Sequence, residues 1–259
     1  MKPAPFGYHR VSSVGEAVST LVAYDGTARA IAGGQSLVPM LNMRLLRPDA
    51  LVDLDGVAAL RALDTDEQTG VTTIGAMTRY TSLEHSRVVA QHLPLLAEIV
   101  RHVGDRQVRN RGTVGGSLSH GDPTAEVPLA CLTLGATVRV AGPGGSREIA
   151  LGDLYETSYA STLEACEVLT EVVVPRAPAH FGFAECCRRH NDFAVVSVAC
   201  VGDRDGSGRW RGVRIGLGGV ADVLVLAASA GGQLDGSDLS DDAIRAAAQA
   251  ALDVVDPPS

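Results

Sequence analysis

The chain has 259 residues, of which 46% are hydrophobic and 20% charged, so it can bury a large core divided among two or three lobes. Its formal net charge of -8 argues against a general affinity for nucleic acid or anionic membranes, because both require clustered lysine and arginine. The N-terminal residues lack the apolar core of a signal peptide, and no apolar run approaches the roughly 18 residues of a membrane helix. We therefore expect a cytoplasmic globular protein with no membrane insertion.

The first 55 residues have the pattern of a small βαβ-like lobe. Ser13 and Glu16 form a capping box, and apolar residues then recur at helical spacing until Gly26. Apolar runs at 28–32 and 50–54 predict two strands, with a loop between them. The first predicted lobe is therefore 1–55.

From residue 56 the pattern changes to that of a second lobe, 56–176. We expect a strand at 70–77, helices at 93–104 and 129–134, a hairpin formed by 136–140 and 146–150, and a strand at 167–175. A glycine-rich segment lies at 111–128, and its TVGGS stretch and His120 are predicted to lie in a loop.

Residues 177–259 are predicted to form a third, antiparallel lobe. Three strand-like runs at 181–189, 193–201 and 213–220 precede a helix at 241–252. The fold class predicted for the whole chain is therefore α+β.

The stretch AGGQSL, residues 32–37, places two glycines, an amide and a hydroxyl after a predicted strand. It matches neither the Rossmann fingerprint nor the P-loop. Glycine lets backbone N–H groups approach an anion closely, although the stretch alone is more typical of a tight turn. A second glycine pair in TVGGS, residues 113–117, suggests that two such loops hold one diphosphate between them.

Two basic clusters permit two interpretations each. One cluster lies within 101–111 and is either a solvated face or a contact for an anionic ligand. The other lies within 188–190 and is either an exposed turn or a group that approaches a cofactor. The residues concerned are Arg101, Arg106, Arg109 and Arg111 in the first cluster and Arg188, Arg189 and His190 in the second.

No arrangement of residues indicates a protein-based catalyst or a metal site. No Ser-His-Asp, Cys-His or clustered-carboxylate pattern is evident, and His120 is best read as a loop histidine. The cysteines lack C-x-x-C spacing, which excludes common zinc and iron–sulfur motifs and favours reduced thiols. The five cysteines are Cys131, Cys166, Cys186, Cys187 and Cys200.

Three stretches together carry a family resemblance: residues 32–54, 109–128 (RNRGTVGGSLSHGDPTAEVP) and 183–200 (FAECCRRHNDFAVVSVAC). They resemble the FAD-binding medium subunit of the molybdenum hydroxylases, the family of carbon monoxide dehydrogenase and xanthine dehydrogenase. The resemblance extends to about residue 256. It implies a two-lobed FAD-binding domain of the vanillyl-alcohol oxidase type, followed by a C-terminal flavoprotein domain that is expected to be shortened at its end.

The resemblance also implies site residues. Glu126 would bind ribose hydroxyls of FAD or, alternatively, serve only as a carboxylate at a helix N-terminus. Asp122 is a further cofactor contact or a surface turn residue, and Val103 and Leu169 line the cofactor pocket or belong to the core. The residues assigned to the diphosphate are Ala32, Gly33, Gly34, Gln35, Ser36 and Leu37 on one side, and Thr113, Val114, Gly115, Gly116 and Ser117 on the other.

The function implied by the resemblance is electron relay. A partner subunit with two [2Fe-2S] clusters would pass electrons from a molybdopterin subunit to the FAD of this chain, and an external acceptor would then receive them. A dimer of heterotrimers is the implied assembly. Two alternatives stay open: a self-contained FAD-dependent reductase or oxidase, and a non-catalytic partner-binding protein with a degenerate FAD fold.

Overall fold

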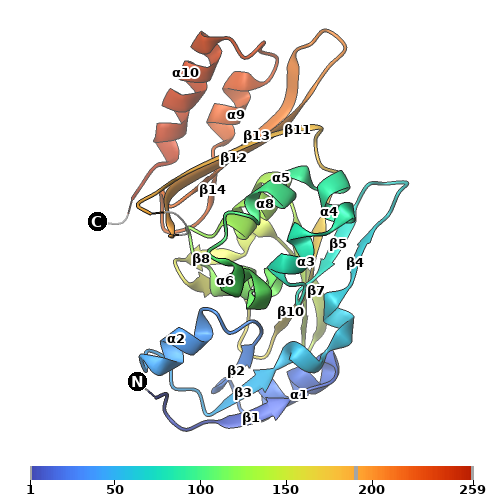
Figure 1. The fold of residues 1–259 in the computed structure, drawn as a ribbon, viewed down its shortest axis with the longest axis vertical. Helices are drawn as coiled ribbons and strands as arrows, with labels where there is room; N and C mark the ends of the chain where they lie inside the picture. The colour runs from blue at the N-terminus through green and yellow to red at the C-terminus, as the bar shows by residue number, and fades with distance from the viewer. Residues whose placement is uncertain (1, 190–191, 258–259) are drawn as a thin grey trace.

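Three β-sheets follow one another along the long axis of the molecule, from the N-terminal end to the C-terminal end (Figure 1). The computed structural model describes residues 2–189 and 192–257. The predicted α+β class is confirmed. The lobe boundaries after residues 55 and 176 stay predictions.

The first sheet is parallel, with the strand order β1-β3-β2. Ser13 caps the connecting helix, since its hydroxyl accepts a hydrogen bond from the Glu16 N–H at 3.2 Å, and the Glu16 carboxylate accepts in return from the Ser12 N–H at 2.8 Å. The predicted loop after β2 contains a short helix, α2. Pro39 is compatible with this helix, because a proline in the first turn costs no backbone hydrogen bond. The elements are β1 (Gly7–Arg10), α1 (Val14–Ala23), β2 (Ala28–Ile31), α2 (Leu37–Asn42) and β3 (Ala50–Asp53).

The second sheet has five strands, all antiparallel, in the order β4-β5-β10-β6-β7. The predicted hairpin and the predicted strand that ends the lobe are confirmed as β6–β7 and β10. Val172 and Val174 of the central strand β10 are fully buried. The strands are β4 (Leu63–Thr65), β5 (Thr72–Gly75), β6 (Thr137–Gly142), β7 (Gly145–Ala150) and β10 (Val168–Val174), with the small hairpin β8 (Tyr155–Thr157) and β9 (Ala160–Ser161) beside them.

Six helices between β5 and β6 cover this sheet. The predicted helix at 93–104 is confirmed only for its first part, as α5, because a turn at 101–104 separates it from the next helix. The loop predicted for TVGGS and His120 is wrong: these residues form α7, and the glycine-rich segment also contains the start of α8. The helices are α3 (Tyr80–Glu84), α4 (Arg87–His92), α5 (Pro94–Ile99), α6 (Arg106–Arg111), α7 (Val114–His120) and α8 (Glu126–Leu134), and short 3₁₀ helices lie at Leu54–Gly56, Ala58–Arg61, Leu151–Asp153 and Leu252–Val254.

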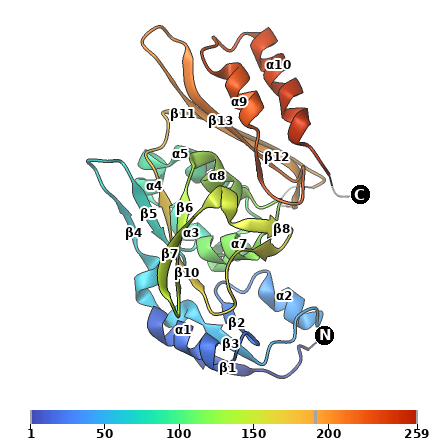
Figure 2. The ribbon, with the colours of Figure 1, turned by 180° about the vertical axis from the view of Figure 1, so that it is seen from behind.

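The third sheet is antiparallel, in the order β11-β12-β13-β14, and lies between α8 on one face and α9 and α10 on the other (Figures 1 and 2). Ala199 and Val201 of β12 join the core that contains α8, whereas Val196 and Val198 pack with the last two helices. The three strands and the helix predicted for this lobe are confirmed. The elements are β11 (His180–Cys187), β12 (Ala194–Arg204), β13 (Trp210–Gly218), β14 (Val225–Leu226), α9 (Ala228–Leu234) and α10 (Asp241–Ala251).

Within the residues placed by the structure, none of the helices is long and apolar enough to cross a membrane.

Candidate cofactor site

The AGGQSL segment leaves the end of β2 and leads into α2, which begins at Leu37. Gly34 has a φ of +73°, in the left-handed region that favours glycine. Gly33 serves a different purpose, because a Cβ there would overlap the carbonyl group of Arg111 and lie 2.8 Å from its carbon. The first glycine therefore permits backbone contact with the end of α6, and the second permits the turn.

The TVGGS segment is a capped helix start. The Thr113 hydroxyl accepts from the Gly116 N–H at 3.2 Å, and Thr113 is 2% exposed. The N–H groups of Val114 and Gly115 donate to the carbonyls of Thr78 and Ala76, at 3.1 and 2.8 Å. The prediction that this segment supplies free backbone donors is wrong for these amides, because the protein already uses them. The partly exposed Ser117 can still present its hydroxyl to a ligand.

The two glycine segments lie against each other. A Cβ at Gly116 would be 3.4 Å from the Cβ of Ala32, and a Cβ at Gly33 would be 3.0 Å from the Cα of Gly112. Figure 2 shows β2 and α2 beside α7 at the junction of the first two sheets. The structure therefore brings together two motifs that are far apart in the sequence.

The first segment provides a row of backbone donors. Within 2–189 and 192–257, no acceptor is found for the N–H groups of five consecutive residues, Gly33 to Leu37. The Gln35 side chain donates to the Gly33 carbonyl at 3.3 Å, and the Ser36 hydroxyl makes no capping bond. Successive unpaired N–H groups around a left-handed glycine form a concave anion-binding nest. These residues fit the phosphate groups of a dinucleotide.

Glu126 occupies the first turn of α8. Burial, above all, raises the pKa of Glu126 to about 7, and the negative charges of Glu185 and Asp122 act in the same direction. The alternative role, a carboxylate at a helix N-terminus, is also compatible with this position. A carboxyl group that titrates near neutrality can accept hydrogen bonds from ligand hydroxyls in either protonation state.

Three other predicted site residues have clear structural roles. The Asp122 carboxylate accepts from the N–H and the hydroxyl of Thr124, at 2.9 and 2.8 Å, as its alternative interpretation as a turn residue requires. Leu169 is 4% exposed within the core of the second sheet, and Val103 packs against that core. A direct contact between these residues and a cofactor stays a prediction.

Tyr80 is a buried residue beside the two glycine segments, although the sequence contains no signal for it. Its ring lies against Gly112, where a Cβ would be 2.9 Å from the Tyr80 Cδ2. Burial raises the pKa of Tyr80, while a hydrogen bond with the Ser117 side chain opposes this rise, and the Glu126 charge adds to it. Tyr80 therefore packs against Gly112, which lies beside both glycine segments.

An ion-pair network holds the first two sheets together at this site. The Asp55 carboxylate accepts from Arg61 at 2.7 Å and from Arg79 at 2.9 Å. Arg79 also donates to the carbonyl of Asn110 at 3.0 Å, one residue before the contact with Gly33. Arg61 chiefly, and then Arg79, hold the pKa of Asp55 below its usual value against the effect of burial. Sequence spacing gave no indication of this network.

The predicted arginine clusters divide between structural and exposed groups. Arg109 pairs with Glu84 at 3.0 Å and donates to two carbonyls, so it stabilises the turn before α6. In the second cluster, Arg188 and Arg189 are exposed, and Arg189 pairs with Asp192 at 3.1 Å. His190 lies outside the described residues.

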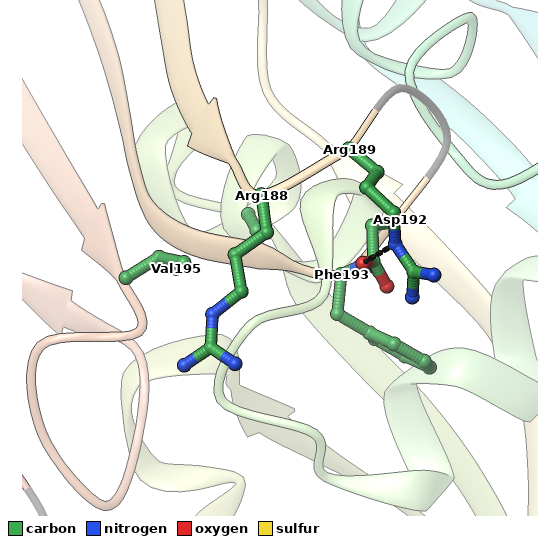
Figure 3. A pocket seen from close by; sticks show the side chains of 6 residues that line it. Arg188, Arg189, Asp192, Phe193 and Val195 are labelled. Carbon is green, nitrogen blue, oxygen red and sulfur yellow. Dashed lines mark hydrogen bonds and ion pairs between the residues drawn. The ribbon is translucent and has the colours of Figure 1, made fainter.

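The second cluster lines an open hollow of about 690 Å³. Figure 3 shows the Arg188 side chain directed away from the ion pair between Arg189 and Asp192. Phe193, also part of the lining, is 75% exposed. The hollow therefore combines cationic groups with an aromatic ring at the end of β11.

His120 is the last residue of α7 rather than a loop residue, because the glycine-rich segment is helical. Its ring lies 5.1 Å from that of Tyr159, and burial lowers the pKa of His120. All five cysteines are free thiols in the structure; Cys131 is buried and Cys186 is exposed.

Comparison with known proteins matches the whole chain. The family model for the FAD binding domain in molybdopterin dehydrogenase covers residues 4–177, and that for the CO dehydrogenase flavoprotein C-terminal domain covers residues 181–259. The chain is 39% identical over 259 residues to the 6-hydroxypseudooxynicotine dehydrogenase complex subunit alpha of Paenarthrobacter nicotinovorans, an alignment that spans 99% of this chain and 87% of that protein.

Solved structures agree with these matches. A chain of carbon monoxide dehydrogenase from Hydrogenophaga pseudoflava has a TM-score of 0.95 at 35% identity, covering 100% of this chain and 90% of that one. A chain of quinoline 2-oxidoreductase from Pseudomonas putida 86 has a TM-score of 0.94 at 38% identity, with the same coverage.

Proposed function

Since this chain belongs to the family of FAD-binding subunits of the molybdenum hydroxylases, we propose that it relays electrons from the [2Fe-2S] clusters of a partner subunit, through FAD, to an external acceptor. Molybdenum and iron–sulfur cofactors belong to other subunits of such complexes. When bound, FAD would supply the two-electron chemistry, and the protein would bind it, orient it and limit the access of water.

The nest formed by residues 33–37 is the observation that carries this proposal. Its five N–H groups lack acceptors within the part of the chain that the structure describes, and a diphosphate would supply them. Uncharged donors are sufficient for this purpose, so the acidic net charge of the chain is no obstacle. The Ser36 hydroxyl and the Gln35 amide can add two side-chain donors.

Residues around the nest would hold the rest of the cofactor. Glu126 would accept hydrogen bonds from ribose hydroxyls, with Asp122 nearby. Thr113 and Ser117 would face the opposite side of the diphosphate, and Val103 and Leu169 would contact the apolar rings. Val114, Gly115 and Gly116 would contribute close packing rather than backbone donors, because their amides are engaged within the protein.

Two partner subunits follow from the same proposal: a small iron–sulfur subunit and a large molybdenum subunit, assembled with this chain as a dimer of heterotrimers. Support comes from the relatives, which are named as subunits of a complex or as medium chains. The substrate of such a complex would be bound outside this chain.

The proposal is tested by expressing the chain alone, recording its visible spectrum and identifying the released chromophore. We expect bound FAD and electron transfer to dyes without turnover of a small substrate. Turnover by the isolated chain would favour the self-contained reductase or oxidase. A folded but colourless chain that takes up no added FAD would favour the degenerate, partner-binding alternative.

A competition experiment addresses the nest itself. If the diphosphate provides the main contact, ADP should displace FAD from the chain, whereas adenosine should fail at the same concentration. Riboflavin, which lacks phosphate, should bind far more weakly than FAD. Equal competition by ADP and adenosine would contradict the assignment of residues 33–37 to the diphosphate.

A further inference from the structure

A run of cations without carboxylates extends from β2 to the loop before β3. Residues 26–48 contain Arg29, Arg44 and Arg47 but no aspartate or glutamate. The whole chain has 22 basic and 30 acidic residues, so the remainder, with 19 basic and 30 acidic residues, has a net charge of -11. Segment 26–48 is therefore a positively charged region in an acidic protein.

Exposed apolar side chains lie among these cations on α2 and in the turn that follows it. Met43 is 54% exposed and Leu45 is 65% exposed, and Val38 in the first turn of α2 is 40% exposed. Figure 1 shows α2 at the edge of the molecule, beside the N-terminal segment. Single exposed apolar residues are ordinary, but neighbouring ones with a polar rim are typical of interaction sites. We call Val38, Met43, Arg44, Leu45 and Arg47 the α2 surface.

The turn that presents Arg44 has a strained backbone. Arg44 has a φ of +60°, in the left-handed region that favours glycine. The N–H groups of Arg44 and Leu45 donate to the carbonyls of Leu41 and Met40, at 3.0 and 2.9 Å, which is a helix end where glycine is the usual residue. An arginine at this position costs free energy relative to glycine, and strain of this kind is typical of functional positions.

The charge of Arg44 is not neutralised by a carboxylate. Its Nε donates to the Lys2 carbonyl at 3.2 Å, which holds the side chain against the N-terminal segment. Within residues 2–189 and 192–257, no carboxylate forms an ion pair with Arg29, Arg44 or Arg47. Arg29 and Arg47 line one hollow of about 220 Å³, to which Asp49 contributes a carboxylate. The α2 surface therefore combines apolar area with positive charge.

The α2 surface begins at the nest. Val38 directly follows Leu37, the last residue of the nest, and a Cβ at Gly34 would lie 3.2 Å from the Val38 Cγ2. A protein bound to α2 would therefore lie beside the candidate cofactor site. Such a position suits a partner that exchanges electrons with the cofactor.

We propose that the α2 surface docks the small iron–sulfur subunit. The inference rests on the proposed function, which supplies this partner, and adds the surface that binds it. Cysteine thiolates give an iron–sulfur cluster a net negative charge, so a cationic surface attracts the subunit that carries it, and complementary charges speed and orient association. The matching face of that subunit should be apolar at its centre, against Met43 and Leu45, and acidic at its rim.

The test is the cluster content of the purified complex. The tagged chain is isolated with its partner subunits from cells that assemble the complex, and iron, molybdenum and FAD are measured per chain. In the double variant Arg44→Glu with Leu45→Glu, we expect the iron content to fall to about a tenth or less. The FAD content and the Tm of the isolated chain should stay unchanged, because both side chains are exposed.

Ile244→Glu with Arg245→Glu is the matched control. These residues form a similar pair of apolar and cationic side chains on α10, where Ile244 is 48% exposed and the Arg245 side chain is 78% exposed. Figure 1 shows α10 and α2 at opposite ends of the molecule. The control should retain its full iron content.

A milder variant tests the charge separately. Arg44→Gly keeps the left-handed turn without steric cost, so the chain should fold as well as the wild type while it loses one cation. Its affinity for the isolated iron–sulfur subunit should fall severalfold. Between about 0.05 and about 0.5 M salt, that affinity should also depend less on salt than the affinity of the wild type does. A purely structural role for Arg44 would leave the salt dependence unchanged.

Full iron content in the α2 double variant would overturn the inference while leaving the proposed function intact. Loss of FAD together with iron would assign the α2 surface to the cofactor, and loss of molybdenum alone would assign it to the large subunit. Either result would also overturn the inference. A wild-type chain without FAD, or a wild-type complex without iron, would instead overturn the proposed function itself.

Discussion

At the scale of single residues, neighbouring glycines in one motif have different physical purposes. Gly34 adopts a left-handed conformation. Gly33 is needed because a residue without a Cβ can pack its backbone against the carbonyl group of Arg111. The sequence predicted that glycine was needed here, because AGGQS follows a strand. It could not predict the contact with Arg111, since that contact joins two residues far apart in the chain and leaves no local pattern.

Gly33→Ala should therefore weaken both packing and FAD binding. The added Cβ would overlap the Arg111 carbonyl group, so one of the two segments must move and displace the nest. We expect a loss of FAD affinity of at least about tenfold and a lower Tm. Gly15→Ala is the control, because no atom lies within 4 Å of a Cβ at Gly15. Normal FAD affinity in Gly33→Ala would show that the two segments need not touch.

Glu126 makes the stability of the FAD-free chain depend on pH. Its pKa rises from 4.5 to about 7, so the folded state retains a proton that the unfolded state releases between these values. The stabilisation is complete below about pH 4.5 and is lost as the pH rises towards 7. The Tm of Glu126→Gln, relative to that of the wild type, should therefore increase as the pH rises from about 5 to about 8. The increase should be equivalent to a few kcal/mol in the free energy of unfolding. A Tm difference that is constant with pH would contradict the burial of this carboxyl group.

At the scale of elements, the sequence predicted the helices and strands that have a regular residue pattern and missed those that lack one. The alternation of β-branched residues correctly predicted β10, and the capping box correctly predicted α1. The helix α7 was missed because two glycines in its first turn count against helix formation. Its Thr113 cap and the packing of Gly115 against Ala76 outweigh that cost.

The cap of α7 can be tested by Thr113→Ala. This change removes the hydroxyl that accepts from the Gly116 N–H in a nearly fully buried position. We expect a loss of about 1 to 2 kcal/mol in the free energy of unfolding, seen as a lower Tm, with weaker FAD retention. Thr113→Ser keeps the acceptor and should recover most of both. If Ser and Ala destabilise the chain equally, the methyl group rather than the cap is responsible.

At the scale of the whole molecule, the third sheet shares its core with the helices of the second. Ala199 and Val201 belong to the same core cluster as α8, although the sequence change near residue 177 suggested a separate lobe. Sequence patterns correctly predicted the strands of this sheet. They could not show which face would meet α8, because both faces of β12 carry small apolar residues.

Gly216→Val should separate the third sheet from α8. Gly216 lies on β13, where a Cβ would overlap the Thr133 hydroxyl and lie 3.0 Å from the Leu129 Cδ1. A valine cannot fit between the sheet and the helix, so the two must move apart and expose the connection after β10. Because Arg176 lies exposed in that connection, trypsin should cut after it severalfold faster in the variant.

The control for this experiment is Gly206→Ala, at an exposed turn where a Cβ meets no atom within 4 Å. Its rate of cleavage after Arg176 should equal that of the wild type. If Gly216→Val resists trypsin as well as the wild type does, then α8 does not fix the position of the third sheet, and the shared core contributes little to holding the molecule together.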